Sequence, residues 1–124
     1  MDDIHGEFIR KARQEYRTIG CTPCPAFGNE PVYFTPKGFK HLVFKNGSYR
    51  PVSDQKRRIS LLRKAVYILK SSKSFFAYRN IQSSKSMIHL WSFMKECDDI
   101  EVIVVVEQID KGRKIFLSVM DRRR

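Results

Sequence analysis

The sequence predicts an α+β domain in which N-terminal helices pack on a small antiparallel β-sheet of about four strands. Apolar residues recur at helical spacing in the first half, and short segments rich in aromatic and β-branched residues follow in the second. A chain of 124 residues, 42% of them apolar, can bury one core. We therefore expect one domain over residues 1–124, divided into an N-terminal helix and proline-rich loop (1–31), a basic helical part (32–70) and the sheet (71–124).

The first half of the chain contains three predicted helices. Apolar side chains at helical spacing predict the first, which ends at Gly20, and the three prolines in residues 21–31 predict a loop after it. A short second helix starts at Thr35-Pro36 and is stopped by Asn46-Gly47. The third helix begins after Pro51 and runs to the end of the basic part.

Four short segments of the second half are predicted to be antiparallel strands: residues 75–81, 87–94, 100–109 and 115–120. The second of them has nearly continuous apolar residues, so a helix there remains an alternative. In the last strand, simple alternation places Ile115, Leu117 and Val119 on the core face. Ser118 then lies on the opposite face.

The positive charge is concentrated in the middle of the chain. Lys and Arg number 24 against 13 Asp and Glu, and residues 36–70 hold ten of the cations but one acid, Asp54. Such a local excess indicates a polyanion partner, and nucleic acid fits better than a membrane surface. No apolar run approaches the length of a membrane span, and the acidic N-terminus does not resemble a secretory signal, so we expect a cytoplasmic protein with free thiols.

Several kinds of catalytic site are excluded by their missing residues. Cys21 and Cys24 have the spacing of half a zinc site, but no second pair follows. The basic part has no cluster of acids that could hold catalytic metal ions, so we expect no metal and no cofactor. Metal-free cleavage of a nucleic acid is chemically accessible for RNA, whose 2′-hydroxyl serves as the nucleophile.

His41 is the candidate catalytic residue for such a reaction. On the second helix, Lys37, Lys40 and His41 fall on one face, so a group that titrates near neutral pH lies among cations. Histidine can transfer the proton, and the lysines can stabilise the charge of the transition state. His5 and His89 have no comparable setting.

The chain resembles a known group of ribonucleases over residues 32–121. Residues 32–45 (VYFTPKGFKHLVFK), the Arg57-Arg58 helix, the strand from Val102 and residues 116–120 (FLSVM) resemble the phage-associated and colicin D-like members of the barnase, EndoU, colicin and RelE (BECR) superfamily. The resemblance implies a metal-independent nuclease with helices before a four-stranded antiparallel sheet. In the colicin D-like pattern a lysine and the adjacent histidine act together at the scissile phosphate, which falls on Lys40 and His41.

The same pattern has a supporting serine in the last strand, which falls on Ser118. It has a tryptophan where this chain has Met120, and this departure weakens any transfer of substrate preference. The resemblance implies a toxin-type endoribonuclease that leaves a 2′,3′-cyclic phosphate, with transfer RNA as one candidate substrate. Its partners would be RNA and an acidic antitoxin or immunity protein.

The predicted site therefore consists of two sets of residues. The catalytic set is His41, Lys40, Lys37 and Ser118, and the RNA-binding set is Arg57, Arg58, Lys45 and Arg50. Two other functions use the same basic face. The chain could bind RNA without cleaving it, or it could bind an acidic protein.

Overall fold

The structure is a computed structural model that describes residues 3–123, and it confirms the α+β class. Residues 1, 2 and 124, at the ends of the predicted domain, lie outside this range. The elements follow in the order α1 (Asp3–Ile19), β1 (Cys21–Cys24), the 3-10 turn η1 (Pro25–Phe27), β2 (Glu30–Tyr33), α2 (Pro36–Val43), β3 (Phe44–Lys45), β4 (Ser48–Tyr49), α3 (Val52–Ser60), α4 (Leu62–Ser71), β5 (Ala77–Gln82), β6 (Met87–Cys97), β7 (Ile100–Ile109) and β8 (Lys114–Arg123).

The main sheet differs from the predicted one. It has six strands in the order β1-β2-β8-β7-β6-β5, and β3 and β4 form a separate two-stranded sheet. The strands from β5 to β8 are antiparallel neighbours, as expected, but β2 joins β8 in parallel. The prediction of a four-stranded, wholly antiparallel sheet is therefore wrong.

β1 and the first half of β2 come from residues 21–31, which were predicted to be a loop, whereas Val32 and Tyr33 of β2 lie in a piece predicted to be extended. β1 and β2 pair antiparallel with Pro23 opposite Pro31. β1 is the edge strand of the sheet, and a proline at an edge loses no hydrogen bond of the ladder. Thr22, Cys24 and Val32 are buried, so this hairpin contributes to the core. Exposed and buried residues alternate along β1, but its proline is typical of a loop and led to the wrong prediction.

Two helix boundaries also differ from the predictions. The third predicted helix is divided into α3 and α4 at Leu61, which is 4% exposed and has a backbone ψ near −4°. The second, α2, ends at Val43, before the predicted stop. Asn46 and Gly47, with φ of 52° and 80°, form the tight turn between β3 and β4. Positive φ at both central residues is typical of a type I′ hairpin turn.

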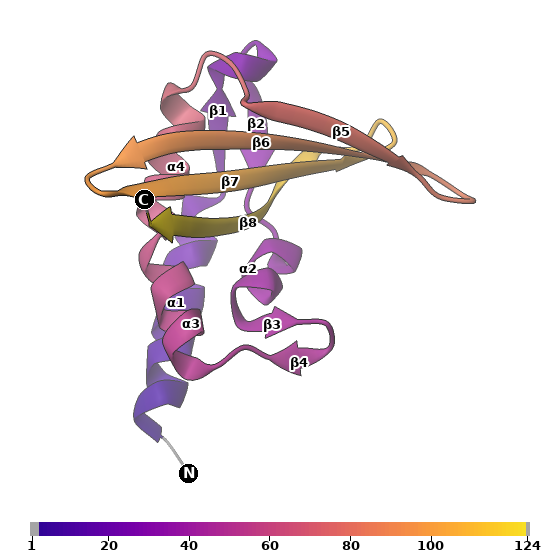
Figure 1. Cartoon of the computed structure of the whole chain (residues 1–124). Helices are drawn as coiled ribbons and strands as arrows, with labels where there is room; N and C mark the ends of the chain where they lie inside the picture. The colour runs from indigo at the N-terminus through magenta and orange to yellow at the C-terminus, as the bar shows by residue number, and fades with distance from the viewer. Residues whose placement is uncertain (1–2, 124) are drawn as a thin grey trace.

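The helices and the sheet enclose one core. Figure 1 shows α4 behind β6 and β7, and α2 beside β8. Val102, Val104 and Val106 alternate along β7 and point to this core. Other buried side chains of the core are Tyr16, Phe39, Leu42, Ala65, Ile68, Leu69, Phe93 and Phe116.

The last strand contains a β-bulge that changes its predicted pattern. Val119 lies opposite Val104 and Ser118 opposite Val105, but Phe116 then lies opposite Val106. The extra residue lets Phe116 and Val119 both face the core, and both are fully buried. The predicted core face is therefore right for Val119 and wrong for Ile115 and Leu117, which are only partly buried, while Phe116 takes their place in the core. Ser118 shares the face of Val105, which points away from the core.

Candidate active site

Helix α2 carries the predicted catalytic lysines and histidine and is docked closely on β8. Pro36 occupies its first turn, where no backbone hydrogen bond is lost. Gly38 is the point of closest approach: an added Cβ would meet the Phe116 carbonyl oxygen and lie 2.5 Å from Tyr16 Oη. Tyr16 Oη donates a hydrogen bond of 2.6 Å to the Thr35 carbonyl. This packing fixes the position of α2 against β8 and leaves its other face, with the lysines and the histidine, turned to the pocket.

An open pocket of about 470 Å³ lies between that face and the β3–β4 hairpin. It brings together most of the predicted site. Its lining contains no carboxylate, which favours binding of an anion. The lining residues are Lys37, Lys40, His41, Phe44, Lys45, Asn46, Gly47 and Arg50.

His41 is half-buried at this pocket. Burial lowers the pKa of the imidazole below its ordinary value, and the positive charges of Lys37 and Arg50 lower it further. Glu107 acts in the opposite direction with a smaller effect. The lowered pKa favours the neutral imidazole, which can accept a proton. The backbone carbonyl of His41 accepts a hydrogen bond of 3.0 Å from Nε of Arg50, the residue after β4, which ties the end of the hairpin to α2.

Glu107 is a site residue that sequence reasoning missed. It is 6% exposed at the end of the buried part of β7, and Lys37 Nζ donates a hydrogen bond of 2.6 Å to its Oε1. A buried carboxylate needs such a partner. In the sequence Glu107 is the polar residue that ends the apolar run 102–106, and nothing local shows that Lys37 lies beside it.

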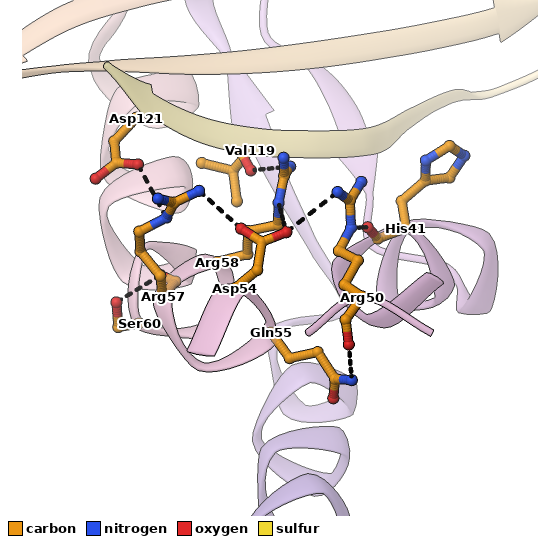
Figure 2. A network of polar contacts seen from close by, with 9 residues as sticks. All are labelled: His41, Arg50, Asp54, Gln55, Arg57, Arg58, Ser60, Val119 and Asp121. Atoms are coloured by element: carbon orange, nitrogen blue, oxygen red, sulfur yellow. Dashed lines mark hydrogen bonds and ion pairs between the residues drawn. The ribbon is translucent and has the colours of Figure 1, made fainter. Parts of the chain in front are cut away.

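Figure 2 shows a second polar cluster next to the pocket, in which Asp54 of α3 faces three guanidinium groups. Arg57 Nη2 lies 2.7 Å from its carboxylate, Arg50 Nη1 3.3 Å and Arg58 Nε 3.4 Å. Burial by itself would raise the pKa of Asp54. The three arginines outweigh it, so the pKa of this carboxyl lies below its ordinary value. Asp54 is ionised at neutral pH and orients Arg50, which in turn holds the backbone of His41.

The remaining predicted residues lie outside the pocket lining. Arg58 is 8% exposed, and its Nη1 donates a hydrogen bond of 3.1 Å to the Val119 carbonyl, so it ties α3 to β8. Arg57 is more exposed and also pairs with Asp121 at 3.3 Å. Ser118 is half-buried in β8 and does not line the pocket. The structure thus joins His41, Lys40 and Lys37 with Lys45 and Arg50.

Among residues 3–123, no group of three or more His, Cys, Asp or Glu side chains is arranged to hold a metal ion. Cys21, Cys24 and Cys97 are free thiols. No helix in the part of the chain that the structure describes is long and apolar enough to cross a membrane.

Comparison of the chain with family models, with curated proteins and with solved structures found no match in any of the three. The reaction that the site could support is therefore inferred from the side chains of the pocket. A neutral imidazole can act as a base, and the ammonium and guanidinium groups around it can hold a phosphate and stabilise added negative charge.

Proposed function

We propose that this chain is a metal-independent endoribonuclease in which His41 is the general base. The observation that carries the proposal is the half-buried, neutral imidazole in a pocket lined by four cations and no carboxylate. RNA supplies the two groups that such a pocket accommodates. Its phosphate is attracted by the cations, and its 2′-hydroxyl provides the proton that the imidazole accepts.

The reaction requires two proton transfers. His41 takes the proton of the 2′-hydroxyl, and the 2′-oxygen forms a bond to the adjacent phosphorus. The bond from phosphorus to the 5′-oxygen breaks, and that oxygen takes a proton from an ammonium group of the pocket, for which we assign Lys40. The products are a 2′,3′-cyclic phosphate and a 5′-hydroxyl. Lys37, held by Glu107, stabilises the charge on the non-bridging oxygens.

The resemblance to the colicin D-like ribonucleases supports this assignment through the adjacent Lys40 and His41. It extends the proposal to a toxin-type enzyme of the barnase, EndoU, colicin and RelE superfamily, with transfer RNA as a candidate substrate and the cytoplasm as its place of action. The net charge of +11 would suit an acidic antitoxin or immunity protein. Covering the pocket with such a partner would block RNA.

The proposal is tested with total RNA in the presence of excess EDTA. We expect cleavage without added metal, with cyclic phosphate ends on the products. His41→Ala should lower the rate by about 10²- to 10⁴-fold, the usual contribution of a general base. His89→Ala is the matched control, because His89 lies on β6, forms a hydrogen bond with Tyr78 and does not line the pocket. Cleavage that needs magnesium, or that survives His41→Ala unchanged, would refute the mechanism.

The second candidate function is RNA binding without cleavage. It is favoured by the exposed aromatic side chain of Tyr49, which stacks on Phe44 at the edge of the pocket. RNA binding that does not depend on His41, with no cut products after long incubation, would select it. The pocket would then serve as a phosphate site alone.

A further inference from the structure

The hairpin of β3 and β4 is an exposed arm that the mechanism above does not explain. Its two strands are each two residues long and make no pairing with the main sheet. Figure 1 shows it below the six-stranded sheet, next to α2. A hairpin of this size is marginal alone in water. It is held at its base by the hydrogen bond of 2.7 Å from the Arg50 amide to the Val43 carbonyl.

Two aromatic rings face each other across this hairpin. Phe44 and Tyr49 are opposite residues in the register, and their ring centroids are 4.2 Å apart at an interplanar angle of 29°. Phe44 lines the pocket, whereas Tyr49 is 72% exposed. One side of Tyr49 is therefore supported by a ring, and most of its surface is in water.

The surroundings of this stacked pair are cationic. Lys40 Nζ lies 5.9 Å from the centroid of the Phe44 ring, and Lys45 and Arg50 line the same pocket. No Asp or Glu occurs in residues 36–53. A flat apolar surface next to phosphate-binding cations is the arrangement that proteins use to hold an unpaired nucleobase.

We infer that Tyr49, supported by Phe44, is a nucleobase-stacking subsite for the nucleotide next to the phosphate in the pocket. The inference rests on the proposed function and sharpens it, because it names the substrate class as single-stranded RNA with an unstacked base. A base inside a duplex cannot offer its face to Tyr49. Every base has such a face, so this subsite selects exposed bases over paired ones and discriminates weakly among the four bases.

Binding experiments separate stacking from phosphate contact. All variants are made in the His41→Ala full-length chain so that the probe stays intact, and affinities are measured by fluorescence anisotropy at one fixed salt concentration. The probes are a short oligoadenylate, an abasic oligoribonucleotide of the same length, and an RNA duplex. Tyr49→Ala removes the ring and Tyr49→Phe keeps it. Tyr67→Ala is the control, because Tyr67 is 56% exposed on α4 and does not line the pocket.

We expect Tyr49→Ala to weaken oligoadenylate binding by about 5- to 150-fold, the range measured for one stacked base. Tyr49→Phe and Tyr67→Ala should change it by less than about twofold, because both leave the stacking ring in place. The abasic probe should bind Tyr49→Ala and its parent equally, and the duplex should bind the parent more weakly than oligoadenylate does. An equal loss on the abasic probe, or no loss on oligoadenylate, would overturn the inference.

The outcomes also distinguish this inference from the proposed function. Cleavage by the unmodified chain without any dependence of oligoadenylate binding on Tyr49 would refute the stacking subsite and leave the nuclease. Binding that depends on Tyr49, with no cleavage by the unmodified chain, would refute the nuclease and keep the subsite. Failure to bind any of the three probes would refute both.

Discussion

Replacing Gly38 by alanine should destabilise the protein because α2 lies so close to β8. The new Cβ would lie 2.5 Å from Tyr16 Oη and 2.7 Å from Phe116 Cδ2, and it would also meet the Phe116 carbonyl oxygen. Overpacking of this kind costs about 1–3 kcal/mol. The carbonyl belongs to a strand of the sheet and cannot turn away, so we place the cost at the upper end. Alanine regains about 1 kcal/mol of helix propensity, which leaves a net loss of about 2 kcal/mol.

Gly6→Ala is the matched control, since Gly6 also lies in a helix but has nothing within 4 Å of an added Cβ. Gly6→Ala should raise the free energy of unfolding by about 0.5–1 kcal/mol. Urea and thermal unfolding of the two variants check the prediction, and the loss at Gly38 should lower Tm by about 6–10 °C. A Gly38→Ala protein as stable as the wild type would show that α2 can move away from β8 without cost.

A double-mutant cycle identifies the contact responsible. Tyr16→Phe removes the hydroxyl that the new Cβ would meet, and it also removes the hydrogen bond to Thr35, worth about 1 kcal/mol. If the clash with Oη is real, Gly38→Ala should cost less in the Tyr16→Phe background than in the wild type. Strictly additive losses would assign the whole cost to Phe116.

The pH–rate profile of cleavage should rise with a midpoint below the ordinary pKa of histidine and level off toward neutral pH, because the pKa of His41 is lowered and the neutral form is the base. Lys37→Met removes a positive charge and leaves Glu107 unpaired, so both effects raise that pKa and should move the midpoint to higher pH. Asp54→Asn should lower the free energy of unfolding in urea at pH 7 by about 1–3 kcal/mol. Because the pKa of Asp54 is lowered in the folded protein, the difference in stability from the wild type should shrink as pH falls through that pKa. Arg58→Met leaves the Val119 carbonyl without this donor, while Asp54 keeps Arg50 and Arg57, and it should lower the free energy of unfolding by about 1–3 kcal/mol in the same assay.

The face of α2 could be predicted because its information is local. A proline at the helix start and the helical spacing of Phe39, Leu42 and Val43 define a buried side, and all three are buried. Lys40 and His41 then fall at the opposite, pocket side by geometry alone. The same reasoning worked for the strands of the second half, where short β-branched runs are separated by polar turns.

The rest of the site depends on contacts between residues far apart in the chain. Glu107 and Lys37 are separated by 70 positions, and neither residue's neighbours indicate the other. The adjacent arginines illustrate the same limit. Arg57 is largely exposed whereas Arg58 is buried, and the difference arises because the carbonyl of Val119 is within reach of Arg58. The bulge in β8 is likewise a feature of its pairing with β7, where the register shifts between Val105 and Val106.

The open edge of β8 explains how these distant contacts form one site. β2 pairs with β8 only at Lys114 and Ile115, so from Phe116 onward the described strand has β7 on one side and no strand on the other. The unpaired backbone groups of an edge strand can pair with another chain, so proteins usually cover such an edge with a helix or loop. Here Gly38 packs against the Phe116 carbonyl, and Arg58 binds the Val119 carbonyl. Covering the edge therefore also positions α2 with His41, and α3 with Asp54, which pairs with Arg50. For this reason substitutions of Gly38 or Arg58, which need not touch RNA, should impair cleavage through the geometry of the pocket.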